Sequence, residues 1–158
     1  MTKNSPLPSK RRRTECVCIN LRRMSRTVSQ IYDDALAPAG LKITQFCLLR
    51  AIERLGPTSV GALADDQELD RTTLTRNLAL LERDGLIEQS PGVDKRMSVA
   101  QLTRAGSAAI ARALPHWEGV QKELRRTLGA ETLAQLGEIH AKISTAANST
   151  SARLSGEN

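Results

Sequence analysis

The segment from Thr44 to Leu102 constrains the fold most, because its periodicity changes from that of a helix to that of strands at Gly85. Before this glycine, three leucines follow the i, i+4, i+7 spacing of one helix face: Leu74, Leu78 and Leu81. After it, two short strand-like runs at 86–89 and 97–102 flank a turn-rich stretch at 90–96. The pattern predicts a helix over 71–84, capped by Asp70, that leads directly into a β-hairpin.

Further helices are predicted on both sides of this segment. Apolar spacing and Gly/Pro breakers place them at 15–37, 44–55, 59–66, 103–128 and 131–147, with Pro115 expected to bend the fourth or to cost it one hydrogen bond. Three short helices followed by a hairpin form a winged helix-turn-helix, so we expect a mainly α fold with a small β-hairpin wing. The expected divisions are a disordered basic arm (1–14), dimerisation helices (15–40 and 103–148), a winged helix-turn-helix DNA-binding domain (41–102) and a flexible tail (149–158).

Composition limits the kinds of partner. A net charge of +6 favours an anionic partner, with nucleic acid first, while an aromatic content of 2% argues against stacking of single-stranded bases. No apolar run reaches the length of a membrane span and the N-terminal residues lack the apolar region of a signal peptide, so a cytoplasmic location with reduced thiols is expected. We find no glycine-rich phosphate loop and no nucleophile–base pair, so we expect neither an enzyme nor a cofactor.

The helix at 71–84 is the predicted recognition helix. The face opposite its leucines carries hydroxyls and a guanidinium, which suit the major groove because arginine can bind guanine bidentately. An ordinary solvated face would also be polar, so the charged hairpin tip adds weight, since a wing arginine can enter a narrow minor groove. The candidate DNA-contacting residues are Arg71, Thr72, Thr73, Thr75, Arg76, Asn77, Asp94, Lys95 and Arg96.

The stretch 74–87 resembles the recognition helix of the MarR (multiple antibiotic resistance regulator) family and its exit into the wing. The Asp-Lys-Arg sequence at 94–96 and the Leu-Thr-Arg-Ala-Gly sequence at 102–106 are similar to the family's wing tip and the start of its fifth helix, and Leu63-Ala64 also fits. The resemblance covers about 16–147. It implies an obligate homodimer with intertwined first, fifth and sixth helices that binds an inverted-repeat operator in double-stranded DNA, commonly as a repressor.

Two long amphipathic helices after the wing favour a partner chain independently of that resemblance, because a small domain cannot bury them alone. The alternative is that both fold back onto the core of one monomer.

Two signals are considered for release from DNA. Family members often bind small anionic or aromatic molecules, and the candidate pocket residues here are Arg26, Tyr32, Phe46 and Trp117. The alternative is a redox signal at Cys18 or Cys16, because 18–41 is similar to the organic hydroperoxide-sensing branch of the family.

The chain departs from that branch in its second helix. Ile43 and Phe46 stand where the branch has two tyrosines, and no cysteine in the fifth helix is available to resolve a sulfenic acid. A small, buried packing role for Cys18 at a dimer interface is the competing interpretation. No metal site is expected, because residues 16 and 18 point about 200° apart on a regular helix.

Overall fold

The computed structural model describes residues 16–92 and 98–155, with side chains through residue 147. The described chain is mainly helical with one small antiparallel sheet, which confirms the expected fold class. The predicted basic arm (1–14) and the tip residues Asp94, Lys95 and Arg96 lie outside the described residues.

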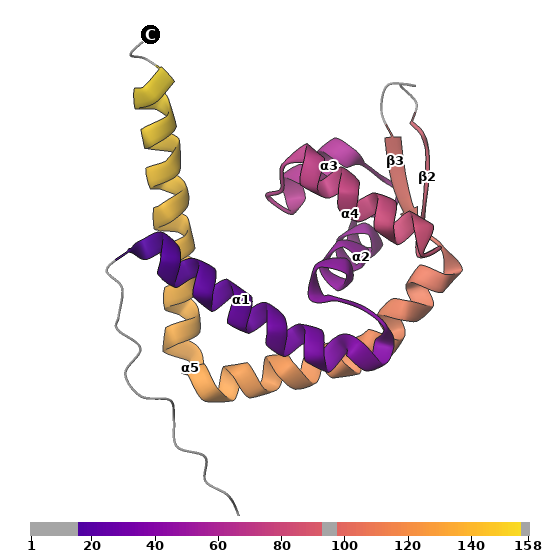
Figure 1. The fold of residues 1–158 in the computed structure, drawn as a ribbon, viewed down its shortest axis with the longest axis horizontal. Helices are drawn as coiled ribbons and strands as arrows, with labels where there is room; N and C mark the ends of the chain where they lie inside the picture. The colour runs from indigo at the N-terminus through magenta and orange to yellow at the C-terminus, as the bar shows by residue number, and fades with distance from the viewer. Residues whose placement is uncertain (1–15, 93–97, 156–158) are drawn as a thin grey trace, which may run out of the picture.

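One lobe contains the three short helices and the sheet (Figure 1). Its elements are α2 (Ile43–Leu55), β1 (Thr58–Ser59), α3 (Val60–Asp66), α4 (Arg71–Arg83), β2 (Ile87–Pro91) and β3 (Ser98–Leu102). The sheet has the order β1-β3-β2, with both pairs antiparallel.

The strands differ from the predicted ones in two ways. β1 was not predicted, and it forms by pairing Thr58 with Ala100 of β3. β2 extends to Pro91, two residues beyond the predicted end, and Pro91 pairs with Ser98. A proline is tolerated there because β2 is an edge strand.

The core of the lobe is apolar throughout. Leu74, Leu78 and Leu81 of α4 are each 0% exposed, which confirms the predicted buried stripe. They belong to one cluster with Phe46 and Leu49 of α2. Among the described residues no polar or charged side chain is buried. The leucine face of α4 is therefore held in the core by apolar packing, and its polar face points outward.

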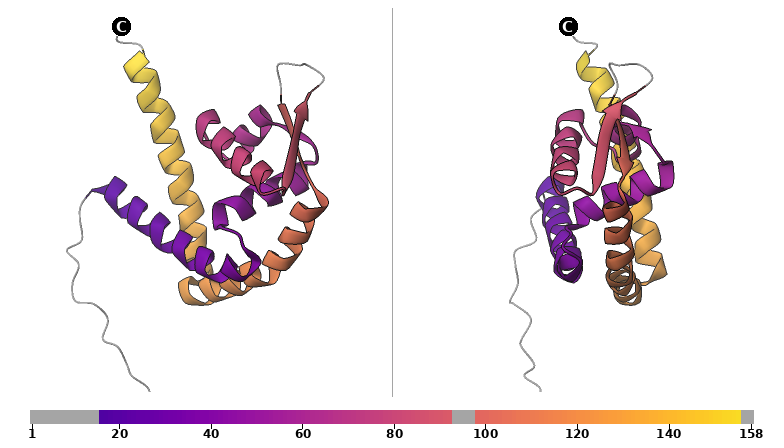
Figure 2. Two further views of the ribbon diagram at one scale, coloured as in Figure 1. Left: turned by 45° about the vertical axis from the view of Figure 1, so that its right-hand side comes forward. Right: turned by 90° about the vertical axis from the view of Figure 1, so that its right-hand side faces the viewer.

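Two long helices frame the lobe: α1 (Val17–Leu36), which leads into η1 (Ala37–Ala39), and α5 (Arg104–Ser155). The C-terminal part of α1 packs against the part of α5 that precedes Gly129, where the Tyr32 hydroxyl meets Gln121 (Figure 1 and, turned by 45°, Figure 2). The backbone of α5 leaves helical geometry only at Gly129 (φ 76°, ψ 161°), while Pro115 stays within the helix. The two predicted C-terminal helices are therefore the parts of α5 before and after Gly129; we call the part after it, 130–155, the C-terminal arm.

The C-terminal arm is longer than predicted. It continues to Ser155, so most of the predicted tail (149–158) is helical backbone. Ser and Thr lower helix propensity without terminating a helix, and the first glycine beyond Gly137 is Gly156.

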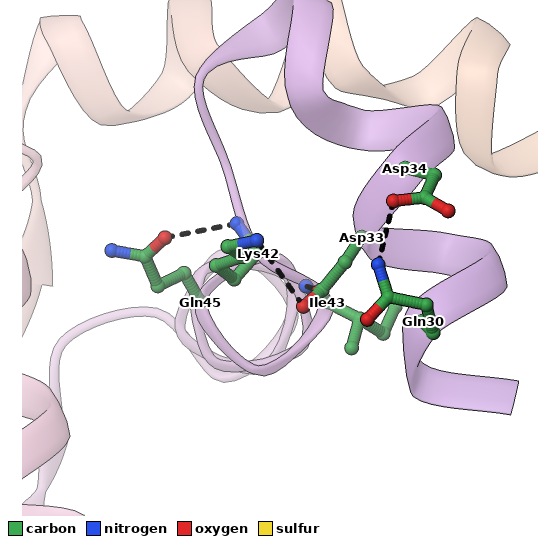
Figure 3. A network of polar contacts seen from close by, with 6 residues as sticks. All are labelled: Gln30, Asp33, Asp34, Lys42, Ile43 and Gln45. Atoms are coloured by element: carbon green, nitrogen blue, oxygen red, sulfur yellow. Dashed lines mark hydrogen bonds and ion pairs between the residues drawn. The ribbon is translucent and has the colours of Figure 1, made fainter. Parts of the chain in front are cut away.

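The junction between α1 and α2 is fixed by polar contacts (Figure 3). Asp33 of α1 accepts a hydrogen bond from the Ile43 backbone N–H at 2.8 Å and forms an ion pair with Lys42 at 3.5 Å. Gln45 in turn accepts from the Lys42 N–H at 2.9 Å. These bonds satisfy the first amides of α2 and orient the lobe relative to α1.

Both framing helices expose large apolar side chains. On α1 these are Val17, Ile19, Leu21, Met24, Val28 and Ile31; on α5 they are Leu128, just before Gly129, and Leu136, Ile139 and Ile143 on the C-terminal arm. In the described part of the chain, no single helix is long and apolar enough to cross a membrane; only 17–39 and 43–55 together reach that length and composition, across a 73° bend.

Candidate nucleic-acid interface

The first turn of α4 is fixed by Asp70, as predicted. One carboxylate oxygen accepts from the Thr73 N–H at 2.8 Å and the other accepts from the Thr73 hydroxyl at 2.6 Å. These bonds from Thr73 lower the pKa of Asp70, so the cap is ionised at neutral pH. The start of α4 is thereby ordered, and the proton of the Thr73 hydroxyl is already donated.

The outward face of α4 carries most of the predicted contact residues. Arg71, Thr72 and Arg76 are exposed, whereas Asn77 is half-buried. Within the described ranges, Arg76 has no carboxylate at ion-pair distance. The Thr75 hydroxyl donates to the Arg71 carbonyl at 2.7 Å. Arg71, Thr72 and Arg76 are consequently the donors of this face best placed to meet an external acceptor.

Arg71 lies at a depression of about 270 Å³ beside α4. Its other lining residues come from this helix and from β1, α3, β2 and β3: Ser59, Val60, Gly61, Thr75, Gln89 and Ser98. Ser59, Gln89 and Ser98 are not among the predicted DNA-contacting residues. Only the pairing of β1 and β2 with β3 brings these three side chains beside Arg71.

The wing is attached to α4 by a carboxylate. Glu82 accepts from the Gln89 backbone N–H at 3.1 Å and from the Gln89 side-chain amide at 2.9 Å. Gln89 belongs to β2, the edge strand nearest α4, so its outward N–H has no strand partner. Glu82 therefore satisfies that N–H and holds the hairpin beside the exposed face of α4.

The predicted effector residues separate into two groups. Phe46 and Trp117 are neighbours, with ring centroids 6.0 Å apart, and both line a depression of about 480 Å³ between α2 and α5. Tyr32 is buried, and its hydroxyl accepts from the Gln121 amide at 2.7 Å. Arg26 lines a different depression on α1, with Leu21, Arg22 and Ser25, and therefore does not join Phe46 and Trp117 within this chain.

The two arginines of the Phe46–Trp117 depression have acidic partners. Arg50 forms an ion pair with Glu53, and Arg54 binds Asp66 at 2.6 Å. The bond from Arg54 lowers the pKa of Asp66. An anionic ligand would therefore have to compete with these carboxylates, whereas a flat apolar ring meets the two aromatic walls directly.

The three cysteines lie in different environments. Cys16 is the N-cap residue of α1 and Cys18 lies in its first turn, and both are exposed. Cys47 lies on α2 and is also exposed, and the protein around it nonetheless raises the pKa of its thiol by desolvation. Over the described residues no group of three or more His, Cys, Asp or Glu side chains could hold a metal ion.

Three short helices, a strand-paired hairpin and an outward-facing, N-capped α4 define a winged helix-turn-helix protein with long flanking helices. The model of the MarR family matches residues 39–97, from the start of the lobe through most of the hairpin, and the chain belongs to the MarR family.

Solved structures share the fold over nearly their whole length. The chain is 38% identical to the Mycobacterium tuberculosis transcriptional regulator MosR crystallised in complex with DNA, with a TM-score of 0.77 over 86% of this chain and 98% of that one. A crystal structure of a cysteine-to-serine mutant of Escherichia coli MarR with operator DNA has a TM-score of 0.72 at 23% identity, over 80% of this chain and 92% of that one. That second likeness concerns the fold alone.

Curated relatives match over a shorter region. The uncharacterized HTH-type transcriptional regulator YxaD of Bacillus subtilis is 33% identical over 88 residues, which are 52% of this chain and 62% of YxaD. YwoH of the same organism, described in the same words, is 26% identical over 80 residues, which are 51% of this chain and 58% of YwoH. The matched region thus spans about three fifths of each of these relatives.

Proposed function

We propose that this chain is a sequence-specific transcription regulator that binds an inverted-repeat operator in double-stranded DNA. The observation that carries the proposal is Arg76, an exposed cation with no acidic partner in the described ranges, on the polar face of a helix whose other face is locked into the core. A guanidinium so placed can bind guanine bidentately in the major groove. The similarity to MosR, whose structure contains DNA, supports this interpretation.

The same proposal includes a homodimer, with 15–40 and 103–148 as the dimerisation helices. Large apolar side chains are exposed along α1 and along the C-terminal arm, and such surfaces are rare on monomeric proteins. A second copy of the chain would cover both faces and place two copies of α4 on successive turns of the duplex.

Selection from a pool of random duplexes tests the function. We expect an inverted repeat with half-sites about one helical turn apart, bound by a dimer in sedimentation, with an affinity that falls steeply as salt rises. Arg76→Ala should cost about 1–3 kcal/mol and relax the choice of one or two bases per half-site. Arg112→Ala is the matched control, because Arg112 is equally charged and exposed but lies on α5.

Two results would contradict this function. One is a monomer that binds every duplex equally, and the other is Arg76→Ala protein that is folded and binds the selected duplex as tightly as wild type does.

We further propose that the chain is a repressor released by a small molecule at the Phe46–Trp117 depression. Trp117 is the only tryptophan of the chain, so its fluorescence reports on that depression directly. A ligand that quenches Trp117 and releases the duplex supports the proposal, and Phe46→Leu, which removes the ring but keeps the core filled, should weaken both effects together. Ligands that release the duplex without changing Trp117 fluorescence would place the effector elsewhere.

The second candidate signal is oxidation of Cys18. It is favoured by the exposure of both Cys16 and Cys18 at the start of α1, where Cys16 stands outside the regular helix with an extended backbone. A hydroperoxide would convert the Cys18 thiol to a sulfenic acid and leave as the alcohol. Peroxide should then release the duplex from wild type and not from Cys18→Ser protein; release from both, or from neither, would exclude this signal.

A further inference from the structure

The residue between β3 and α5, Thr103, touches the exit of α4. Its backbone N–H donates to the Leu86 carbonyl at 3.1 Å, and its side-chain hydroxyl donates to the Gly85 carbonyl at 2.7 Å. Gly85 and Leu86 are the residues through which α4 leads into β2, and the Leu86 N–H is itself bonded to the Leu81 carbonyl at 2.9 Å. Thr103 is therefore bonded to the carbonyls of both residues that lie between the C-cap of α4, Asp84, and the start of β2.

The same hydroxyl oxygen also begins α5. It accepts a hydrogen bond from the Gly106 N–H at 3.0 Å, which is the bond of an N-cap residue to the third residue of its helix. A hydroxyl has one proton to donate and two lone pairs, so it can make both bonds at once. A single oxygen atom thus joins the end of α4 to the start of α5.

Gly106 keeps these two helices in direct backbone contact. A Cβ atom at this position would lie 2.0 Å from the Leu86 carbonyl oxygen and 3.2 Å from a methyl carbon of Leu102. Only a residue without a side chain allows α5 to approach the exit of α4 this closely. The contact is held by the Thr103 bonds and allowed by Gly106; we call these two residues and their partners Gly85 and Leu86 the α4–α5 joint.

We propose that Thr103 is a positioning residue that sets the angle between α4 and α5, and through it the separation of the two DNA-reading helices in the dimer. The inference rests on the proposed function, because α5 carries the proposed dimerisation surface and α4 the proposed reading surface. Since α5 runs as regular helix from this joint to the break at Gly129, a small change of angle at the joint displaces α4 relative to a partner that is held by the rest of α5.

Loss of the joint should therefore alter which half-site separations are bound. DNA fixes the distance between half-sites. A dimer with a loosened joint has its two α4 helices at that distance for only a fraction of the time. The apparent affinity falls by that fraction. Binding to the wrong separation should fall less, or improve, because the loosened dimer can adapt to it.

The test uses the full chain and the inverted-repeat duplex that wild type selects, together with the same duplex carrying one base pair more or one fewer between its half-sites. Thr103→Val keeps the shape and removes the hydroxyl, Thr103→Ser keeps the hydroxyl, and Ser107→Ala is the matched control. Ser107 lies in the same turn, and its hydroxyl donates to the Thr103 carbonyl at 3.3 Å rather than to the exit of α4.

We expect Thr103→Val to bind the selected duplex about five- to tenfold more weakly, while its preference over the altered duplexes shrinks by a similar factor. Thr103→Ser should restore the preference, and Ser107→Ala should stay within about twofold of wild type. An equal loss on all three duplexes would overturn the inference, because a role in stability alone weakens binding at every separation.

Amide hydrogen exchange tests the joint without DNA. In Thr103→Val protein the Gly106 amide should exchange faster while the buried turns of α4 around Leu78 keep their protection. Unchanged exchange at Gly106 would overturn the inference, as would general unfolding. If the wild-type chain selects no duplex, the proposed function is contradicted. The exchange of the Gly106 amide then still tests whether Thr103 holds the α4–α5 joint.

Discussion

At the scale of single residues, the surface of α4 is shaped by hydroxyls that already have acceptors. Thr73 donates its proton to Asp70 and Thr75 donates to the Arg71 carbonyl. Both can still accept hydrogen bonds or present a methyl group to thymine, but neither can donate to a phosphate without breaking an internal bond. This leaves Arg71, Thr72 and Arg76 as the donors of the face.

Asp70 should make the stability of the protein depend on acid pH. Its pKa is lowered in the folded state, so its contribution is complete above the unfolded value of about 3.9 and is lost as pH falls through the lower folded value. Asp70→Ala should lower the Tm by about 2–4 °C at pH 7, and this difference should shrink in acid. Asp70→Asn, which keeps a capping oxygen, is the control. Melting curves from pH 2 to pH 7 measure the effect, and a difference between Asp70→Ala and wild type that does not vary with pH would contradict it.

Cys47 should react slowly with alkylating agents at neutral pH. Desolvation raises the pKa of its thiol, and only the thiolate is the nucleophile. Its rate with iodoacetamide should keep rising with pH above about 8.5, where an ordinary cysteine levels off. Mass spectrometry of the Cys47 peptide gives the rate, and the unfolded chain is the reference. If the rate for folded Cys47 levels off at the same pH as in the unfolded chain, or at a lower pH, the folded site does not desolvate the thiol.

At the scale of elements, local signals predicted most of the fold. The caps Ser59 and Asp70 and the leucine stripe of α4 were visible in the sequence, because a cap and a helix face depend on residues three or four apart. β1 was missed because its two residues form a strand only through β3, about forty positions later. The depression around Arg71 was missed for the same reason.

The break in α5 illustrates a different limit of prediction. Pro115 was expected to bend the helix or to remove one of its hydrogen bonds, and the backbone leaves helical geometry at Gly129, which was not predicted as a break within one helix. A proline costs one internal hydrogen bond and can be absorbed by a gentle curve, whereas a positive φ strains every residue except glycine. The apolar periodicity predicted that the next helix begins at Glu131, close to this break. Periodicity alone does not show whether two helices are joined by a loop or by a single residue with a positive φ.

Gly129→Ala should therefore destabilise the protein by about 1 kcal/mol and weaken the proposed dimer, because the arm can no longer turn without strain. Gly137→Ala is the matched control on the same arm. It lies within regular helix with nothing within 4 Å of an added Cβ, and it should stabilise the protein by up to about 1 kcal/mol. Denaturant unfolding and sedimentation measure the two effects. Equal effects of the same sign would show that the turn at Gly129 is not needed.

At the scale of the whole molecule, α5 makes the lobe and the arm one structure. The helix starts in the joint behind α4, passes α1 and ends in the arm, where His140 lies 3.2 Å from Glu68 in the turn between α3 and α4. The proposed division into DNA-binding and dimerisation parts therefore describes roles, since the part of α5 before Gly129 packs against the lobe and leads directly into the arm.

Deleting 131–158 should leave the apolar face of α1 without the cover that the partner's arm supplies in the proposed dimer. We expect aggregation or loss of duplex binding, since side chains such as Met24 and Val28 are exposed in the single chain. Deletion of 149–158 alone is the control and should leave assembly intact. Light scattering and sedimentation follow the outcome. A soluble, monomeric 1–130 fragment that binds the selected duplex as wild type does would rule out the intertwined dimer.

The contact between Glu82 and Gln89 also affects how the sheet behaves toward other sheets. An edge strand with open amides is a template on which another strand can add. Here the Gln89 amide is already bonded to a side chain, Pro91 has no N–H to offer, and the opposite edge, β1, is only two residues long. Two hairpins brought close together on neighbouring sites would thus lack a row of free donors through which to join. The bond that orients the wing also keeps each sheet at three strands.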